Sequence, residues 1–263
     1  MITSLQNPLI KYIVKILHKN SFRRKEKKFV AEGTREVRRA MLGGYKVEKI
    51  IFCRDIFTST GLLDELKKEN PGVEVIEVTR QVYEHIAYRG STEGIMILGR
   101  QKSHQPDWSA LPDRDLFLLL AEKIQKPGNI GALLRTTDAV GTSAVILIDP
   151  LTDIYNPNVI RSSLGTVFTQ KIFIAGLDDI KNLKETLTIK IFAATLQNAN
   201  IYWKEKYTNN VAIAVGNEAE GLSDEFRKWA DKNIYIPMNG MADSLNVSVS
   251  AAVILYEALR QRS

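Results

Sequence analysis

Three segments in the second half of the chain place polar and glycine residues directly after apolar runs that have the composition of buried strands. These segments are residues 122–131, 216–223 and 236–248. In α/β proteins, ligands bind beyond the carboxyl ends of the strands, which is where such segments lie. We therefore regard these three segments as candidate loops of one ligand-binding site.

The first candidate loop contains the turn formers Pro127 and Gly128, followed by Asn129. Asparagine often caps a helix, because its side-chain oxygen accepts backbone N–H groups of the first turn. We expect Asn129 to cap a helix over residues 130–140, whose apolar residues face a sheet. Arg135 then lies about 140° around from Ile130 and points away from the core, either as an ordinary surface arginine or as a ligand contact.

The second candidate loop, residues 216–223, places Glu218 between two glycines. Gly216 would let a ligand approach the backbone closely, and Gly221 tolerates a positive φ angle. A carboxylate held there can orient a substrate, although an isolated loop glutamate is more often only solvated. This loop is therefore a candidate site only in combination with the other two.

The third candidate loop, residues 236–248, is apolar yet irregular in pattern. Such backbone loses hydration on burial unless a ligand or local packing uses its amide groups. We expect Asp243 or Ser244 to cap the last helix of the chain. Asn246 and Ser248 then either bind a ligand or satisfy nearby backbone groups.

The elements around these loops alternate between strands and helices, which predicts a doubly wound parallel sheet with helices on both faces. We assign residues 116–263 to this α/β domain, 103–115 to a linker and 1–102 to a smaller α/β domain. In the second domain, the expected strands are 116–121, 144–148, 171–174, 190–194, 211–215 and 233–236, and the expected helices are 130–140, 158–164, 177–186, 224–230 and 245–262. In the first domain, we expect strands at 29–31, 47–53, 73–78 and 94–98, with helices at 34–42 and 62–69.

Positive charge is concentrated at the start of the chain. The net charge is +6, yet residues 1–50 contain 13 Lys or Arg against 4 Glu. A helix with an apolar stripe over residues 9–17 carries Lys11, Lys15 and Lys19 off that stripe and leads into a predicted basic loop. Such asymmetry indicates a polyanionic partner, with nucleic acid first, although a solvated basic face is the alternative. The residues expected to bind RNA are Arg23, Arg24, Lys25, Lys27 and Lys28.

Several classes of protein are disfavoured by what the sequence contains. Cys53 is the single cysteine, so no intramolecular disulfide can form, and the three histidines are far apart, so we expect no metal site. No apolar run reaches the roughly 18 residues that a membrane span needs, so no membrane partner is expected. Lys11 and Lys15 interrupt the first apolar stretch, which argues against a signal peptide, and we expect a cytoplasmic protein.

Taken together and in this order, the three loops resemble the SpoU (TrmH-like) branch of the SPOUT superfamily, whose members are RNA ribose 2'-O-methyltransferases. The first motif is similar to Asn129-x-Gly131-x-x-x-Arg135, and the second to Gly216-Asn217-Glu218-x-x-Gly221-Leu222-Ser223. The third extends from Ile236-Pro237-Met238 to Ser244-Leu245-Asn246-Val247-Ser248, and residues 161–165 fit the middle helix of the family. The first domain resembles the substrate-binding module of the family, which has an L30e-like fold.

The resemblance implies a trefoil-knotted α/β fold, a homodimer and S-adenosylmethionine as the cofactor. The residues that it places at the cofactor are Thr195, Leu196, Gly216, Asn217, Ile236, Met238 and Leu245. The residues that it places in catalysis are Arg135, Asn129, Glu218, Ser244 and Asn246, with Asn129 and Arg135 reaching the cofactor of the neighbouring subunit. Lys126 departs from the pattern, because many members have an acidic residue there.

The implied reaction is an in-line attack of a ribose 2'-hydroxyl on a sulfonium methyl group. Arginine side chains stay protonated near neutral pH, so we expect Arg135 to stabilise negative charge or hold a phosphate rather than accept a proton. Ribosomal RNA is the expected substrate and tRNA the alternative. Two alternatives of other classes are a non-catalytic RNA-binding protein and a Rossmann-type dehydrogenase. Asp149 follows the Pro127-Gly128 turn at a spacing that would suit the dehydrogenase, but the chain lacks its G-x-G-x-x-G motif.

Overall fold

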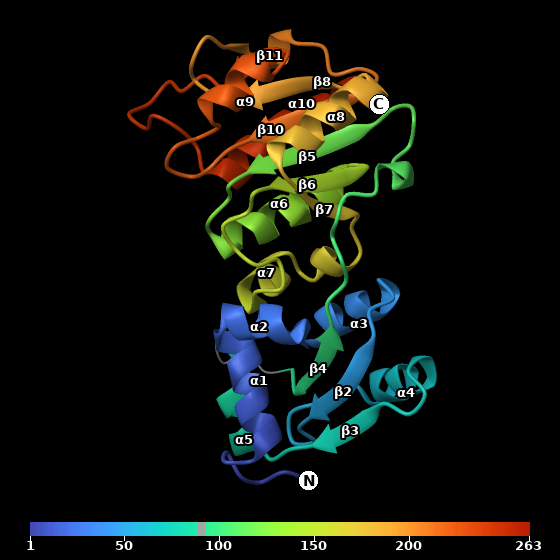
Figure 1. Cartoon of the computed structure of the whole chain (residues 1–263). Coiled ribbons are helices and arrows are strands. Elements are labelled where there is room, and N and C mark those ends of the chain that lie inside the picture. Colours follow the sequence, from blue (N-terminus) through green and yellow to red (C-terminus); the bar gives the residue numbers. More distant parts are fainter. Residues whose placement is uncertain (89–92) are drawn as a thin grey trace. The chain divides into compact units, whose positions relative to one another are not determined.

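The structure is a computed structural model that describes residues 1–88 and 93–263. The chain forms two compact units (Figure 1). The first unit comprises residues 1–103 and 153–169, and the second comprises residues 104–152 and 170–263. The segment 153–169, which the sequence reasoning assigned to the second domain, therefore packs with the first.

The first unit is built on a mixed four-stranded sheet of order β1-β4-β2-β3, in which only the pair β2 and β3 is parallel. Its core lies between this sheet and the apolar side of α1, where Ile10, Ile13 and Ile16 have no exposed surface. The elements of this unit are α1 (Pro8–His18), α2 (Asn20–Glu26), β1 (Lys28–Glu32), α3 (Thr34–Leu42), β2 (Val47–Phe52), α4 (Thr60–Glu69), β3 (Glu74–Glu77), α5 (Arg80–Ile86), β4 (Ile95–Arg100), α7 (Pro157–Ser162) and η3 (Thr166–Phe168).

The second unit is built on a seven-stranded parallel sheet of order β7-β6-β5-β10-β8-β11-β9, which confirms the parallel sheet expected from the sequence. Strands β5, β6 and β10 are buried along their whole length, as strands covered on both faces must be. The elements of this unit are η2 (Trp108–Ala110), β5 (Phe117–Glu122), α6 (Pro127–Val140), β6 (Ala144–Ile148), β7 (Ile172–Ala175), α8 (Leu177–Leu187), β8 (Lys190–Ala194), β9 (Asn200–Ile201), η4 (Tyr202–Lys204), β10 (Val211–Val215), α9 (Asp224–Trp229), β11 (Lys232–Tyr235) and α10 (Val247–Arg262).

Helices cover both faces of this sheet. On one face, Ile180 and Leu183 of α8 and Phe226 of α9 pack against alternate residues of the central strands. Successive strand residues point to opposite faces, so the remaining strand residues face the other side, where α10 contacts both β10 and α6. Within the described part of the chain, no helix is long and apolar enough to cross a bilayer.

Two predicted helix caps are wrong. Helix α6 begins at Pro127 with Lys126 at the N-cap position, so Asn129 lies inside the first turn and its side chain is left for other partners. Proline is well suited to that first position, because its missing N–H would be unbonded there in any case. Helix α10 is capped by Asn246, whose side chain accepts the N–H of Ser248, and not by Asp243 or Ser244.

One further local expectation differs from the structure. The residues after α1 do not form a basic loop, because 20–26 make the short helix α2. At Gly216, the expected close approach of a ligand stays a prediction, and the structure adds a second reason for glycine, since a Cβ atom there would lie 2.1 Å from the carbonyl carbon of Gly221. The second loop therefore folds tightly onto its own start. Gly221 does adopt the expected positive φ, 71°.

Candidate functional site

A cavity of about 530 Å³ lies in the second unit, at the carboxyl ends of β8, β10 and β11. Pockets of roughly 300–1,000 Å³ are typical of sites for cofactors and other small molecules. All seven residues that the sequence placed at a cofactor line this cavity: Thr195, Leu196, Gly216, Asn217, Ile236, Met238 and Leu245. Of the five residues expected in catalysis, Glu218, Ser244 and Asn246 line it and Asn129 and Arg135 do not.

The lining of the cavity contains both apolar and polar side chains. Leu196, Ile236, Met238, Leu245 and Ile254 supply aliphatic or thioether surface. The polar lining includes Asn217, Glu218, Ser244 and Asn246, together with the charged residues Lys126, Glu220, Arg227 and Asp243. Apolar surface beside polar groups that can fix a ligand's orientation is typical of sites for small molecules and cofactors.

Glu218 joins the second loop to the first. Its carboxylate accepts hydrogen bonds from the backbone N–H of Lys126 at 2.9 Å, the backbone N–H of Gln125 at 3.1 Å and Nδ2 of Asn129 at 2.8 Å. Partial burial acts to raise the pKa of Glu218, but these donors outweigh it and hold the pKa below its usual value. Glu218 is therefore an ionised structural anchor, and not the solvated loop residue that was the alternative.

Asn129 carries the network on to the third loop. While its Nδ2 donates to Glu218, its Oδ1 accepts a hydrogen bond from Nδ2 of Asn246 at 3.1 Å. Asn246 also caps α10, because its Oδ1 accepts the N–H of Ser248 at 2.9 Å. The three predicted residues therefore form one hydrogen-bonded chain that connects all three loops, with Asn129, 9% exposed, at its centre.

Two further contacts position the loops. One is made by Asn217, which was predicted at the cofactor, and the other by Glu122, for which the sequence predicted no role. Asn217 donates from Nδ2 to the carbonyl of Lys123, which adds a second link between the first two loops. The carboxylate of Glu122, at the end of β5, accepts hydrogen bonds from both N and Oγ of Ser223 at 2.7 Å. Glu122 is 3% exposed, and an acidic residue ending a buried strand was the signal that could have identified it.

Arg135 lies on the exposed side of α6, as predicted, and forms no ion pair with the residues that the structure describes. Ser244 is exposed at the cavity. The backbone N–H of Thr195 donates to the carbonyl of Ile234 at 2.9 Å. A ligand could therefore be bound only by the carbonyl group or the side chain of Thr195. The network thus includes three of the five predicted catalytic residues and leaves Arg135 free.

The prediction that Arg23 binds RNA is wrong. Its side chain is 2% exposed, and it donates to Asp153 at 2.7 Å and to the carbonyls of Ile16 and Leu17. Lys28 is half-buried and pairs with Glu48. Arg24, Lys25 and Lys27 are exposed, so the expectation that they bind RNA stays a prediction.

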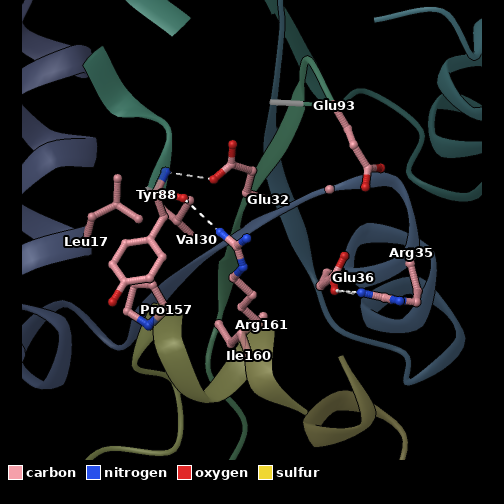
Figure 2. A pocket seen from close by; sticks show the side chains of 11 residues that line it. Leu17, Val30, Glu32, Arg35, Glu36, Tyr88, Glu93, Pro157, Ile160 and Arg161 are labelled. Carbon is pink, nitrogen blue, oxygen red and sulfur yellow. Dashed lines mark hydrogen bonds and ion pairs between the residues drawn. The ribbon is translucent and has the colours of Figure 1, made fainter. Parts of the chain in front are cut away.

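A second, smaller cavity of about 130 Å³ lies in the first unit and contains both acidic and basic side chains (Figure 2). Figure 2 shows that the backbone of Tyr88 donates to Glu32 and accepts from Arg161, while Arg35 pairs with Glu36. Burial raises the pKa of Glu32 to about 7, although hydrogen bonds from Tyr88 and Tyr83 oppose this. The described residues contain no group of three or more His, Cys, Asp or Glu side chains arranged to hold a metal ion.

Comparison with known proteins agrees with this geometry. The model of the SpoU rRNA Methylase family matches residues 116–256, and the model of the MRM3-like substrate binding domain matches residues 7–97. The chain belongs to the SpoU rRNA Methylase family.

Three similar proteins cover nearly the whole chain. The 23S rRNA (guanosine(2553)-2'-O)-methyltransferase RlmP of Bacillus subtilis is 28% identical over 242 residues, which is 92% of each chain. An AdoMet-bound rRNA methyltransferase from Sinorhizobium meliloti is 27% identical, with a TM-score of 0.88 over 98% of this chain and 97% of that one. A solved RNA 2'-O ribose methyltransferase is 34% identical, with a TM-score of 0.85 over 99% and 98%.

Proposed function

We propose that this chain is an S-adenosylmethionine-dependent RNA methyltransferase that methylates a ribose 2'-hydroxyl of ribosomal RNA. The observation that carries the proposal is the cavity lined by all seven residues expected at the cofactor, beside the chain of hydrogen bonds from Asn246 through Asn129 to Glu218. Ribosomal RNA is proposed over tRNA because the similar proteins of matching length include rRNA methyltransferases.

The cavity fits S-adenosylmethionine in chemistry as well as in size. Ile236, Met238 and Leu245 would supply apolar contacts to the cofactor, and the polar residues of the lining would bind its hydrogen-bonding and charged groups. When bound, the cofactor supplies a methyl group made electrophilic by a positively charged sulfur. Its leaving group is a neutral thioether, so the protein needs only to align the reactants and stabilise the oxygen that loses its proton.

The residues of this chain divide that work. Glu218, Asn129 and Asn246 fix the relative positions of the three loops through hydrogen bonds. Arg135 supplies a permanent positive charge that stabilises the developing alkoxide or holds an adjacent phosphate, and the 2'-hydroxyl proton passes to a phosphate oxygen or to water. Ser244 lies at the cavity rim, where its hydroxyl can contact the substrate ribose.

We also propose that the active form is a homodimer and that the third loop and α10 belong to a trefoil knot. Arg135 supports the dimer, because it does not line the cavity of its own chain. Val249 and Tyr256 of α10 support it as well, since they expose 46% and 51% of their surfaces. A second subunit would cover these side chains while bringing an Arg135 to the cavity.

The experiment that tests the function combines binding with mapping. Titration calorimetry should give a stoichiometric complex with S-adenosylmethionine and none with NAD. The protein should then transfer labelled methyl groups to ribosomal RNA from cells that lack it, at a single position that resists alkaline cleavage. Labelling of tRNA instead would overturn the choice of substrate, and binding of NAD or failure to label any RNA would overturn the activity.

A further inference from the structure

Many cationic side chains of the first unit pair with carboxylates, but most of those between residues 11 and 27 do not. On the sheet, on α3 and beside β2, most pair with carboxylates: Lys28 and Arg100 with Glu48, Lys49 with Glu74, Arg54 with Glu77 and Arg38 with Glu65. Along α1 and α2, six cations are exposed and form no ion pair with any residue that the structure describes: Lys11, Lys15, Lys19, Arg24, Lys25 and Lys27. We call these six residues the basic strip.

The basic strip has almost no acidic residue near it in sequence. Residues 8–27 contain seven Lys or Arg and one acid, Glu26. That carboxylate accepts a hydrogen bond from the hydroxyl of Tyr12 at 2.9 Å, and so does not neutralise a member of the strip. The positive charge of residues 1–50 is therefore uncompensated mainly along α1 and α2 and at their C-caps. Figure 1 shows where these two helices lie in the first unit.

The strip is held on rigid elements. Lys11 and Lys15 are four residues apart, so they lie on one side of α1, about 6 Å apart along its axis, and Lys19 follows at the C-cap of that helix. Arg23 fixes the joint between the two helices, because its guanidinium donates to the carbonyls of Ile16 and Leu17 at 2.7 and 2.9 Å. The cations therefore form a preorganised row and not a set of independent flexible charges.

Two kinds of polyanion could meet such a row, and α1 favours one of them. A basic amphipathic helix binds an anionic membrane by inserting its apolar side between the lipids. The apolar side of α1 is already used, because Ile10, Ile13 and Ile16 are fully buried in the core of the unit. A helix that has only its cationic side available suits the phosphates of a nucleic acid.

We propose that the basic strip binds the phosphate backbone of the substrate RNA, with Lys11 and Lys15 of α1 and Lys19, at the C-cap of that helix, as its centre. This inference rests on the proposed function and specifies the surface that receives the RNA. Such contacts position the RNA without reading its bases, so their loss should weaken binding to all RNA sequences alike. Compared with the five residues that the sequence predicted to bind RNA, the basic strip leaves out Arg23 and Lys28 and adds Lys11, Lys15 and Lys19, which the sequence analysis had counted only as part of the positive charge.

The test compares two triple variants of the full chain. K11Q/K15Q/K19Q removes three members of the strip, and K46Q/K67Q/K68Q removes three other exposed lysines of the same unit. Binding to a ribosomal RNA transcript is measured from 0.05 to about 0.5 M salt. Loss of three phosphate contacts should lower the slope of log K against log salt by about 2 to 3, so that binding at 0.1 M salt is roughly 100-fold weaker.

The outcomes separate this inference from the function. Support requires that the first variant shows this loss, that the control variant stays within about twofold of the parent, and that K11R/K15R/K19R binds like the parent. Equal loss in both glutamine variants, no loss in the first, or a parent protein that binds anionic lipid vesicles more tightly than RNA would overturn the inference. Titration with S-adenosylmethionine should give the same affinity in all variants, and failure of the parent in that titration would instead refute the proposed function.

Discussion

Replacing Arg23 with methionine should destabilise the first unit by about 3–5 kcal/mol. The change leaves the carboxylate of Asp153, whose side chain is 7% exposed, without the guanidinium that lies 2.7 Å from it. Removing one partner of a buried ion pair typically costs this much, because the remaining charge stays buried and uncompensated. The backbone N–H of Tyr155, 2.9 Å from the other carboxylate oxygen, still donates to this carboxylate but carries no positive charge.

The double variant R23M/D153L separates the charge from the packing. Both charges are gone, so the large penalty should disappear. The carbonyls of Ile16 and Leu17 still lose their donor, and near the end of a helix that loss should cost about 1–2 kcal/mol. We therefore expect the double variant to be more stable than R23M.

Amide hydrogen exchange followed by mass spectrometry measures both effects locally. In R23M, protection of peptides from α1 and from residues 153–169 should fall by roughly 150-fold to 5,000-fold, the factor that corresponds to 3–5 kcal/mol. Peptides from β10, in the second unit, serve as the internal control. A loss below about 1 kcal/mol in R23M, or a double variant less stable than R23M, would refute the assignment of Arg23 as a buried structural residue.

Three further predictions concern the site and the small cavity. Glu218→Gln and Asn129→Ala should each lower kcat/KM for methyl transfer by about 100-fold. Because the two side chains share one hydrogen bond, the double variant should lose far less than the product of the two single losses. A double variant whose loss equals that product would contradict the hydrogen-bonded chain from Asn246 to Glu218. Arg135→Ala should leave the melting temperature within about 1 °C of the parent, since the side chain is exposed, yet abolish most turnover, with Arg135→Lys retaining part of it; full turnover in Arg135→Ala would end its proposed role. Burial raises the pKa of Glu32 to about 7, so between about pH 4.5 and pH 7 the folded chain keeps a proton on Glu32 that the unfolded chain releases. The free energy of unfolding should therefore fall by up to about 3 kcal/mol as the pH rises through this range. Glu32→Gln should flatten that part of the curve in urea titrations, and an unchanged slope would show that Glu32 is not its cause.

Most elements of the fold could be predicted from local pattern. The helix at Thr34–Leu42 and the strands at Ala144–Ile148, Lys190–Ala194 and Val211–Val215 have the predicted bounds, because glycines, charges or turn residues flank clear apolar runs. Helix α5 and strand β9 were missed. Seven-residue and two-residue elements are too short for a period to show, and tertiary packing decides whether they form.

The loops of the site were predictable, but most of their internal contacts were not. Polar residues after buried strands mark a ligand site on sequence alone. The bond between Asn129 and Glu218 depends on β5 and β10 being neighbours, although 89 residues separate the two side chains. Sequence order does not give strand order, so Asn129 was assigned the local role of a helix cap when its partners were distant.

Arg23 and Arg24 show the same limit for charge. Adjacent residues of a helix point about 100° apart, which is enough to bury one side chain and expose its neighbour. Composition counts both residues as positive, yet Arg23 forms a buried ion pair with Asp153, whereas Arg24 is exposed. The charge available to RNA is therefore fixed by packing, one residue at a time. For this reason the lysines on the exposed side of α1, and not the densest run of basic residues in the sequence, are the decisive positions for testing how the RNA is held.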